Sequence, residues 1–312
     1  HLEPSANFTA YLQGIQVYRF HHYQHVGKAS DSIVHLDHTF RGRMPDRDSL
    51  VDAHLAQERI RYCLKELWIR RLLAEKEKLE PAEFAERYWR LARLWGLSDF
   101  FIDVPFLPAA SLRRISETPH AVMEDEDYLS AAEEGVSLEQ VQRGDVVLCS
   151  HPPVTDEDHH WPAATLADQS GWRVVRDIPV GHWSEAHTLS LASLRVSVDY
   201  APLSRFRFEG ERAWCDVILC DSYTLSAGKH QVVVRNQAVF LESKELLIPS
   251  ASVGIEALRQ VSAYAEHGDP YSLDDDALQA DSRLLTDRVL AEFASLRGEG
   301  QADTLAKVLD AG

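Results

Sequence analysis

The sequence predicts an α+β protein with an N-terminal helical hairpin, a central antiparallel small β-barrel or sheet, and C-terminal helices. Apolar residues recur every three or four positions over residues 48–95, which is the period of a helix. Residues 144–245 instead carry short β-branched and aromatic runs between Pro, Gly and Asp/Ser clusters, and the helical period returns from residue 250. Helices, then strands, then helices are typical of α+β folds. The predicted regions are 1–115 (mainly helical), 116–143 (an acidic connector), 144–245 (the β module) and 246–312 (C-terminal helices).

The helical hairpin follows from spacing and from capping residues. One long amphipathic helix is predicted from Asp48 or Ser49, either of which suits an N-cap, to about Glu80. A second helix follows, with Pro81 at its first position and Gly96 just after its end. The first helix is indicated by apolar residues three or four positions apart: Leu50, Val51, Leu55, Ile60, Leu64, Leu67, Trp68, Leu72 and Leu73.

The β module is predicted from five or six strand-like runs in about 100 residues without intervening helices. The stretch between its first two runs, residues 151–171, contains prolines and a cluster of charges, so we expect a loop there. Two helices should follow the module, over residues 250–268 and 276–298, each ending at a glycine.

Composition restricts the partners and the location. The formal charge of −17 disfavours nucleic acid and anionic lipid, so we expect neither nucleic acid nor membrane as a partner. No apolar run is long enough to span a bilayer and no signal peptide is visible. The four scattered cysteines contain no C-x-x-C pair and suit a reducing compartment, so we expect a cytoplasmic protein.

Three segments resemble nitrile hydratase β-type subunits and their accessory relatives. LWIRRLLAEKEKLEPAEFAER (67–87) is similar to their leucine-rich helix, break and second helix. QRGDVVL (142–148) and RFRFEGERAWCDVILCDSY (205–223) resemble the first and last strands of their SH3-like barrel. The resemblance implies a partner subunit that carries the metal on a cysteine cluster. The sequence departs from the family in the barrel loop, where it reads HPPVTDEDHHWPAATLADQSG.

The densest group of candidate metal ligands lies in CSHPPVTDEDHHW (149–161). His151, His159 and His160 are candidate ligands there, and Asp158 is a candidate acid–base residue, because imidazole and carboxylate groups suit divalent transition metals. On an extended segment Asp158 and His160 share one face while His159 points to the other. The alternative is a solvated loop between two strands.

Two further segments carry candidates. GHWSEAH (181–187) offers His182 and His187 as ligands and Glu185 as a catalytic acid–base residue. Its spacing forms no self-contained metal motif, since H-E-x-x-H needs histidines four apart, so it would add ligands to a site completed by the 151–160 segment. The alternative is a polar loop.

HLDH (35–38) offers His35, Asp37 and His38 as metal ligands. His35 and Asp37 would share one face of a strand. A His-x-Asp pair can bind iron or zinc, and an aspartate can also orient a histidine as a general base. The pattern is short, and 15 histidines in 312 residues make some clustering expected by chance.

These observations predict a metal-dependent enzyme, or the subunit of one, that acts on a small polar organic substrate through histidine and carboxylate groups. We expect Fe, Zn or Co as cofactor, a hydro-lyase, hydrolase or oxidoreductase reaction, and an oligomer. The alternative is a non-catalytic adaptor or accessory protein that binds a partner protein. No nucleotide-binding or nucleophile motif is present, and the long helices and acidic surface fit this alternative equally well.

Overall fold

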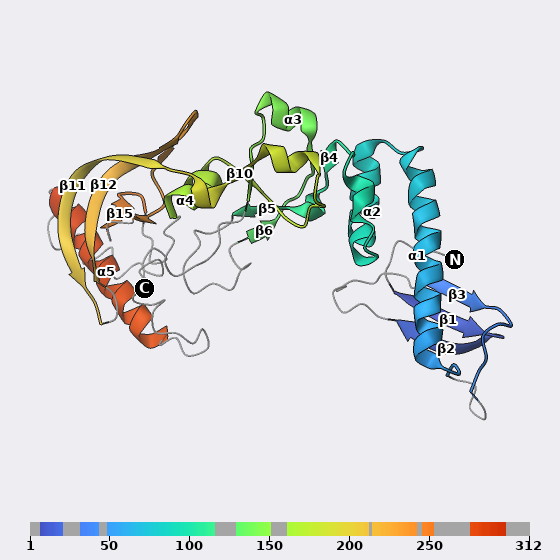
Figure 1. Cartoon of the computed structure of the whole chain (residues 1–312). Coiled ribbons are helices and arrows are strands. Elements are labelled where there is room, and N and C mark those ends of the chain that lie inside the picture. The colour runs from blue at the N-terminus through green and yellow to red at the C-terminus, as the bar shows by residue number, and fades with distance from the viewer. Residues whose placement is uncertain are drawn as a thin grey trace. The chain divides into compact units, whose positions relative to one another are not determined.

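The computed structural model describes residues 7–20, 32–43, 49–115, 129–150, 161–211, 214–241, 245–252 and 275–297, with side chains in the last range from residue 280. Its helices and strands confirm the α+β class (Figure 1). The chain forms two compact units, each built from segments that are distant in sequence. The first unit comprises His1–Ser111, Glu133–Arg143 and Asp177–Ala186, and the second comprises Leu112–Ala132, Gly144–Arg176 and His187–Gly312.

The region predicted as mainly helical begins with a three-stranded sheet in the order β2-β1-β3. β1 (Phe8–Leu12) pairs antiparallel with β2 (Ile15–Phe20) and parallel with β3 (Ser32–Leu36). Gln13 and Gly14, between β1 and β2, both have positive φ, as the tightest hairpin turns require. Phe8 is buried and stacks on Phe20, with ring centroids 5.4 Å apart. The aromatic-rich segment at residues 7–20 therefore forms strands and not helix.

The long helix α1 (Ala53–Lys76) is present, but it begins later than predicted. Its N-cap is Asp52, whereas the expected caps were Asp48, which lies outside the described residues, and Ser49. Backbone pairing explains the difference, because the carbonyl of Ser49 accepts the N–H of Arg43 and the N–H of Val51 donates to Arg41. The chain before α1 is therefore held by an antiparallel β-bridge between Leu50 and Gly42, and the helix begins only after Asp52.

The second helix, α2 (Pro81–Leu94), confirms both predicted end signals. Pro81 is at the first position, where its missing N–H has no intrahelical partner to lose. At the other end the N–H of Leu97 donates to the carbonyl of Ala92 at 2.7 Å, and that of Gly96 to Arg93. Gly96 has φ +62, so this is a Schellman ending with glycine at the left-handed position.

Short elements and buried aromatic rings complete the first unit. They are η1 (Ser98–Phe101), β4 (Phe106–Leu107), η2 (Ala109–Ser111), β7 (Val136–Ser137) and α3 (Leu138–Arg143), with β4 antiparallel to β7. Phe84, Trp89 and Phe101 are each at most 2% exposed and pack as stacked and edge-on rings. The aromatic residues around 84–101 therefore form core.

The second unit contains a five-stranded sheet in the order β10-β8-β9-β5-β6. Its strands are β5 (Leu112–Ile115), β6 (Leu129–Ala131), β8 (Leu148–Ser150), β9 (Arg173–Val175) and β10 (Thr188–Ser190). β8 is parallel to β9 and β10, whereas β5 is antiparallel to β9 and β6. The predicted connector 116–143 is described only from residue 129, and there it forms β6, β7 and α3.

A second sheet has the order β11-β12-β15-β14, with β13 also paired to β12. Two predicted strands are merged in β11 (Ser197–Glu209), which is antiparallel to β12 (Trp214–Ala227). β13 (His230–Val234), β14 (Val239–Phe240) and β15 (Glu245–Pro249) follow, and β15 is parallel to β12. The β module is thus mixed rather than purely antiparallel, and the described strands form open sheets rather than a closed barrel.

Helix α4 (Trp161–Gln169) occupies the stretch that the sequence predicted as a loop. It contacts β5 of one sheet and β12, β13 and β14 of the other, and most of its residues are buried. Pro162 did not prevent the helix because it lies in the first turn, where no intrahelical N–H bond is lost. The helix is therefore the apolar centre of the second unit, and η4 (Leu191–Ser193) packs beside it.

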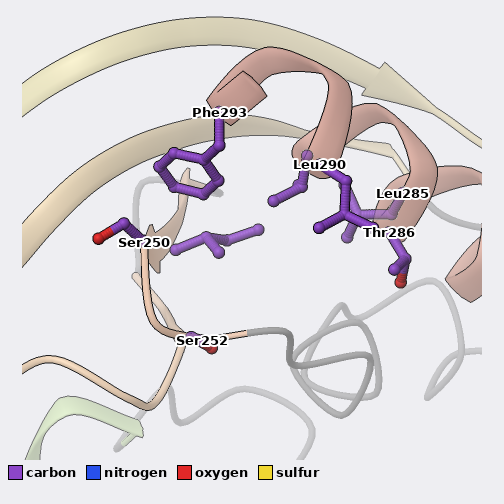
Figure 2. A pocket seen from close by; sticks show the side chains of 8 residues that line it. Ser250, Ser252, Leu285, Thr286, Leu290 and Phe293 are labelled. Atoms are coloured by element: carbon purple, nitrogen blue, oxygen red, sulfur yellow. The ribbon is translucent and has the colours of Figure 1, made fainter. Parts of the chain in front are cut away.

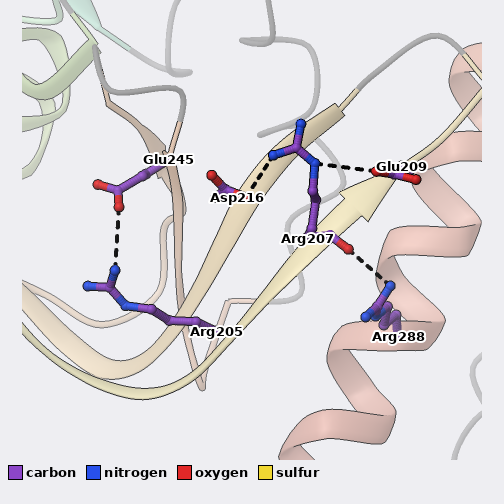
Figure 3. Close-up of polar contacts among 6 residues, drawn as sticks. All are labelled: Arg205, Arg207, Glu209, Asp216, Glu245 and Arg288. Atoms are coloured by element: carbon purple, nitrogen blue, oxygen red, sulfur yellow. Dashed lines mark hydrogen bonds and ion pairs between the residues drawn. The ribbon is translucent and has the colours of Figure 1, made fainter.

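The predicted C-terminal helix is confirmed as α5 (Asp275–Leu296), whereas the helix predicted over 250–268 is outside the described residues from 253 onward. α5 packs on β11, where the guanidinium of Arg288 lies 4.4 Å from the Phe206 ring centroid and donates to the Arg207 carbonyl at 3.1 Å. Figure 3 shows this bond and the ion pairs of the Arg207 side chain with Glu209 and Asp216. These ion pairs lie within β11 and between β11 and β12 and are largely exposed, so each contributes little to stability.

None of the described helices combines the length and the apolar character needed to cross a membrane. The four cysteines are free thiols, and only Cys63 among them is exposed.

Candidate functional site

The HLDH segment forms a turn rather than a ligand cluster. Asp37 follows β3, and its Oδ1 accepts hydrogen bonds from the backbone N–H of Thr39 at 2.9 Å and from the Thr39 hydroxyl at 2.5 Å. These two bonds hold the pKa of the Asp37 carboxyl below its usual value. His35 lies on β3 with its ring 5.9 Å from that of Tyr11, and His38 is exposed in the turn.

The GHWSEAH segment separates its candidates by burial. His182 is 2% exposed, whereas Glu185 and His187 are exposed in or at the end of η3 (Trp183–His187). The Glu185 carboxylate accepts the backbone N–H of Gly181 at 3.0 Å and so closes the turn around His182. Glu185, predicted as a catalytic group, therefore has a local structural partner.

The buried ring of His182 is neutral near pH 7. Its Nδ1 lies 2.8 Å from the Ser184 hydroxyl and accepts the Ser184 N–H at 3.2 Å, so the proton of the neutral ring is on Nε2. Nε2 is buried and has no hydrogen-bond partner within geometric limits among the described residues. Burial lowers the pKa of His182 to about 4, although the nearby Val104 carbonyl and the Glu185 charge oppose this shift. The ring packs against the indoles of Trp89 and Trp183, with centroids 6.2 and 5.1 Å away, and its role as a metal ligand stays a prediction.

The four remaining candidates, His151, Asp158, His159 and His160, lie outside the described residues. Within the described ranges, no three His, Cys, Asp or Glu side chains come together as a group able to hold a metal ion. The candidates of the HLDH and GHWSEAH segments thus form no such group among themselves.

An open polar pocket of about 430 Å³ lies in the second unit and was not predicted from the sequence. It is lined by Arg114 of β5, Ser130 of β6, Asp168 near the end of α4, and Arg173 of β9, with Gly171, Trp172 and Ile115 completing the wall. Strand pairing explains this grouping, because Arg114 and Ser130 are direct partners across β5 and β6. The volume is within the range of small-molecule sites in proteins.

The turn after α4 places Asp168 and Arg173 in the pocket. The N–H of Trp172 donates to the Ala167 carbonyl at 2.8 Å and that of Gly171 to the Asp168 carbonyl at 2.9 Å, which is again a Schellman ending. Gly171 has φ +66, a backbone conformation that favours glycine. Trp172 is 3% exposed, so its buried ring fixes the start of β9.

The pocket is lined by two arginines and one aspartate. Asp168 is half-buried, and burial raises the pKa of its carboxyl group against a weak hydrogen bond from the Gln169 side chain at 3.4 Å. Its position in the last turn of α4 also disfavours a negative charge. Arg114 is exposed and forms no ion pair with any described residue, whereas Arg173 donates to the Gly171 carbonyl. The pocket therefore combines two guanidinium groups with a carboxyl group whose pKa burial raises.

A second cavity lies between α5 and the end of β15 (Figure 2). It is mainly apolar, measures about 50 Å³, and is lined by Ile248, Ser250, Ser252, Leu285, Thr286, Val289, Leu290 and Phe293. The Thr286 hydroxyl is already bonded to the Ser282 carbonyl. This volume is well below that of an organic ligand site, so the cavity is a packing defect beneath α5.

Comparison of the chain with protein-family models, with curated proteins and with solved structures gives no match. The segments that resemble nitrile hydratase β-type subunits form a helix, break and helix over 67–87 and the β11–β12 hairpin over 205–223. The resemblance itself stays a prediction.

Proposed function

We propose that the chain binds a small anionic organic molecule in the pocket of Arg114, Asp168 and Arg173 and exchanges a proton with it. The observation that carries the proposal is that two groups line one pocket: the exposed guanidinium of Arg114, which forms no ion pair with any described residue, and the carboxyl group of Asp168, whose pKa is raised by burial. Guanidinium groups bind carboxylates through paired, charge-assisted hydrogen bonds. This function keeps the predicted small polar substrate and moves its site away from the histidine-rich segments.

The chemical role of each group follows from its charge. Arg114 and Arg173 would hold the anionic group of the ligand, and the Ser130 hydroxyl would donate or accept one further hydrogen bond. Asp168 retains its proton to higher pH than an exposed aspartate, so it suits a general acid that protonates the ligand and is then a general base. The proposed reaction class is therefore proton transfer to or from the carbon atom next to the carboxylate of a small organic acid, with Asp168 giving or taking the proton.

Calorimetric titration with a panel of small mono- and dicarboxylates, and with the corresponding neutral amides, tests the proposal. We expect saturable binding of at least one carboxylate and none of its amide. Arg114→Gln should weaken that binding about tenfold or more, since a charge-assisted bond is lost. Arg195→Gln is the matched control, because Arg195 is an exposed arginine of the same unit outside the pocket.

Asp168→Asn separates binding from chemistry. It should leave carboxylate binding within a few-fold of the unaltered chain, because the pocket keeps both arginines. It should abolish exchange of the carbon-bound proton next to the ligand's carboxylate with solvent, which is followed by deuterium incorporation from D2O. If no member of the panel binds, the proposal fails, and the metal-dependent enzyme and the adaptor protein are the alternatives left.

The divalent metal that the sequence predicts stays a prediction. Elemental analysis of protein purified without an affinity tag tests it, with His159→Ala and His160→Ala as variants. Stoichiometric Fe, Zn or Co that both substitutions reduce would support a metal-dependent form of the enzyme. Carboxylate binding that persists after metal removal would show that the arginine pocket acts without the metal.

A further inference from the structure

The two arginines of the polar pocket lie side by side on one face of their sheet. In the antiparallel pair of β5 and β9, Arg113 is the partner of Val174. Continued by one position, this register sets Arg114 opposite Arg173. Directly opposite residues of an antiparallel pair share a face, with Cβ atoms about 4.5–5.5 Å apart. Since both side chains line the pocket, their guanidinium groups belong to one binding surface.

Two positive charges placed in this way repel each other, and a bound anion relieves the repulsion. The row across the sheet continues with Ser130, the uncharged partner of Arg114 on β6. Asp168 is the acidic residue among the described residues of the lining. The lining therefore carries a net positive charge whether Asp168 is ionised or protonated, whereas the whole chain has a formal charge of −17.

We propose that the ligand of this pocket is a short dicarboxylate whose two carboxylate groups are held separately, one by Arg114 and one by Arg173. This inference rests on the carboxylate binding proposed above and adds a second carboxylate, so that each arginine holds its own. A guanidinium group presents five N–H donors in a fixed fork and pairs with one carboxylate through two parallel hydrogen bonds. The bond that Arg173 donates to the Gly171 carbonyl uses one of its five donors.

Charge and spacing favour two carboxylates over one. A single carboxylate shared between the arginines would neutralise only one of the two positive charges. Burial raises the pKa of the Asp168 carboxyl group, which reduces the negative charge that the protein itself supplies, so the second charge has to come from the ligand. Neighbouring strands lie about 4.7–4.9 Å apart, a separation that a chain of about four or five carbon atoms spans.

Calorimetric titration with malonate, succinate and glutarate, each beside its half-amide, tests the second charge. A dicarboxylate and its half-amide have nearly the same size and share one carboxylate, so they differ only in the second charge. We expect at least one dicarboxylate to bind tenfold or more tightly than its half-amide, because a charge-assisted pair is lost with the amide. The comparison uses the unaltered chain and does not depend on the folding of a variant.

Arginine substitutions test the assignment of one carboxylate to each guanidinium group. Arg114→Gln and Arg173→Gln should each weaken binding of the dicarboxylate tenfold or more and reduce its preference over the half-amide to within about threefold, because one carboxylate is left unpaired. Arg195→Gln, the control outside the pocket, should keep both the affinity and the preference. Asp168→Asn should keep the preference, since it leaves both guanidinium groups in place.

The outcomes separate this inference from the proposed function. Half-amides that bind as tightly as their dicarboxylates overturn the inference and leave a site for one carboxylate. A preference that survives in both Arg114→Gln and Arg173→Gln also overturns it. If no dicarboxylate, half-amide or monocarboxylate binds, the proposed function fails and the inference fails with it. A preference that both arginine variants remove, without deuterium incorporation into the ligand, supports the inference and contradicts only the proton exchange.

Discussion

The buried imidazole of His182 should make the stability of the protein depend on pH, and His182→Asn should remove that dependence. The folded state holds the ring neutral, with a pKa lowered to about 4 from an ordinary 6.5 because the ring is 2% exposed. The unfolded state binds a proton on this ring below about pH 6.5, so protonation favours unfolding. Stability from this residue is therefore complete above pH 6.5 and is lost as the pH falls from 6.5 towards 4.

The size of the effect follows from the two pKa values. One pKa unit corresponds to about 1.4 kcal/mol of differential free energy. Between pH 7.5 and pH 5.8 the unfolded ring becomes largely protonated while the folded ring stays neutral, which lowers the free energy of unfolding by about 1 kcal/mol. The lower pH stays above the isoelectric point of 5.3, so the protein keeps a net negative charge.

Urea unfolding at the two pH values, followed by tryptophan fluorescence, measures this loss. Trp183 and Trp89 have rings 5.1 and 6.2 Å from that of His182, so their emission reports on this part of the core. The unaltered chain should lose about 1 kcal/mol more than His182→Asn on going to pH 5.8. His54→Asn, which removes an exposed ring, is the control. Equal losses in the unaltered chain and in His182→Asn would refute the reasoning.

Three further predictions concern packing and bonding. In the folded protein only Cys63 should react rapidly with Ellman's reagent, because the other three thiols are buried and burial raises their pKa to about 11 or 12. Rapid reaction of more than one thiol per chain would contradict this. Gly210→Ala should lower the free energy of unfolding by about 1–3 kcal/mol and reduce the melting temperature, because its new methyl group would overlap the buried carboxylate of Asp281. An unchanged melting temperature would show that α5 can shift away from residue 210 at no cost in stability. Trp183→Phe should cost about 1 kcal/mol in urea unfolding, because the indole N–H donates to the Val104 carbonyl at 2.7 Å; no loss would mean that water replaces this bond.

The helices with strong local signals could be predicted from the sequence. Pro81 and Gly96 mark the ends of α2 because each satisfies a local backbone requirement, namely a missing N–H and a positive φ. The start of α1 could not be predicted, because it depends on pairing of residues 49–51 with 41–43, a contact that no local pattern encodes. α4 was missed for a related reason, since its nearly all-round burial between two sheets removes the helical alternation of apolar and polar residues.

The candidate pocket could not be predicted from the sequence, because its residues come from segments that are distant along the chain. Arg114, Ser130 and Asp168 are each separated by more than ten residues, and they meet only through the pairing of β5 with β6 and β9. The histidine-rich segments are dense in candidate ligands, but proximity in sequence implies little about whether side chains converge in space. His182 illustrates this, since its ring turns into the core while Glu185 three residues later is exposed.

The apolar residues of α1 do not all lie on one buried face, contrary to what the helical period predicts. The spacing of the nine apolar residues in this segment predicts one face of an amphipathic helix. In the structure, Leu64 and Trp68 are buried, whereas Leu55 and Leu73 are exposed to water. A helix needs only one apolar stripe to pack on its own unit, so the surplus residues are not explained by folding. Water-exposed leucine and tyrosine side chains aligned over five turns disfavour solubility unless they are covered. These exposed apolar residues distinguish α1 from α2, whose buried face accounts for its apolar residues.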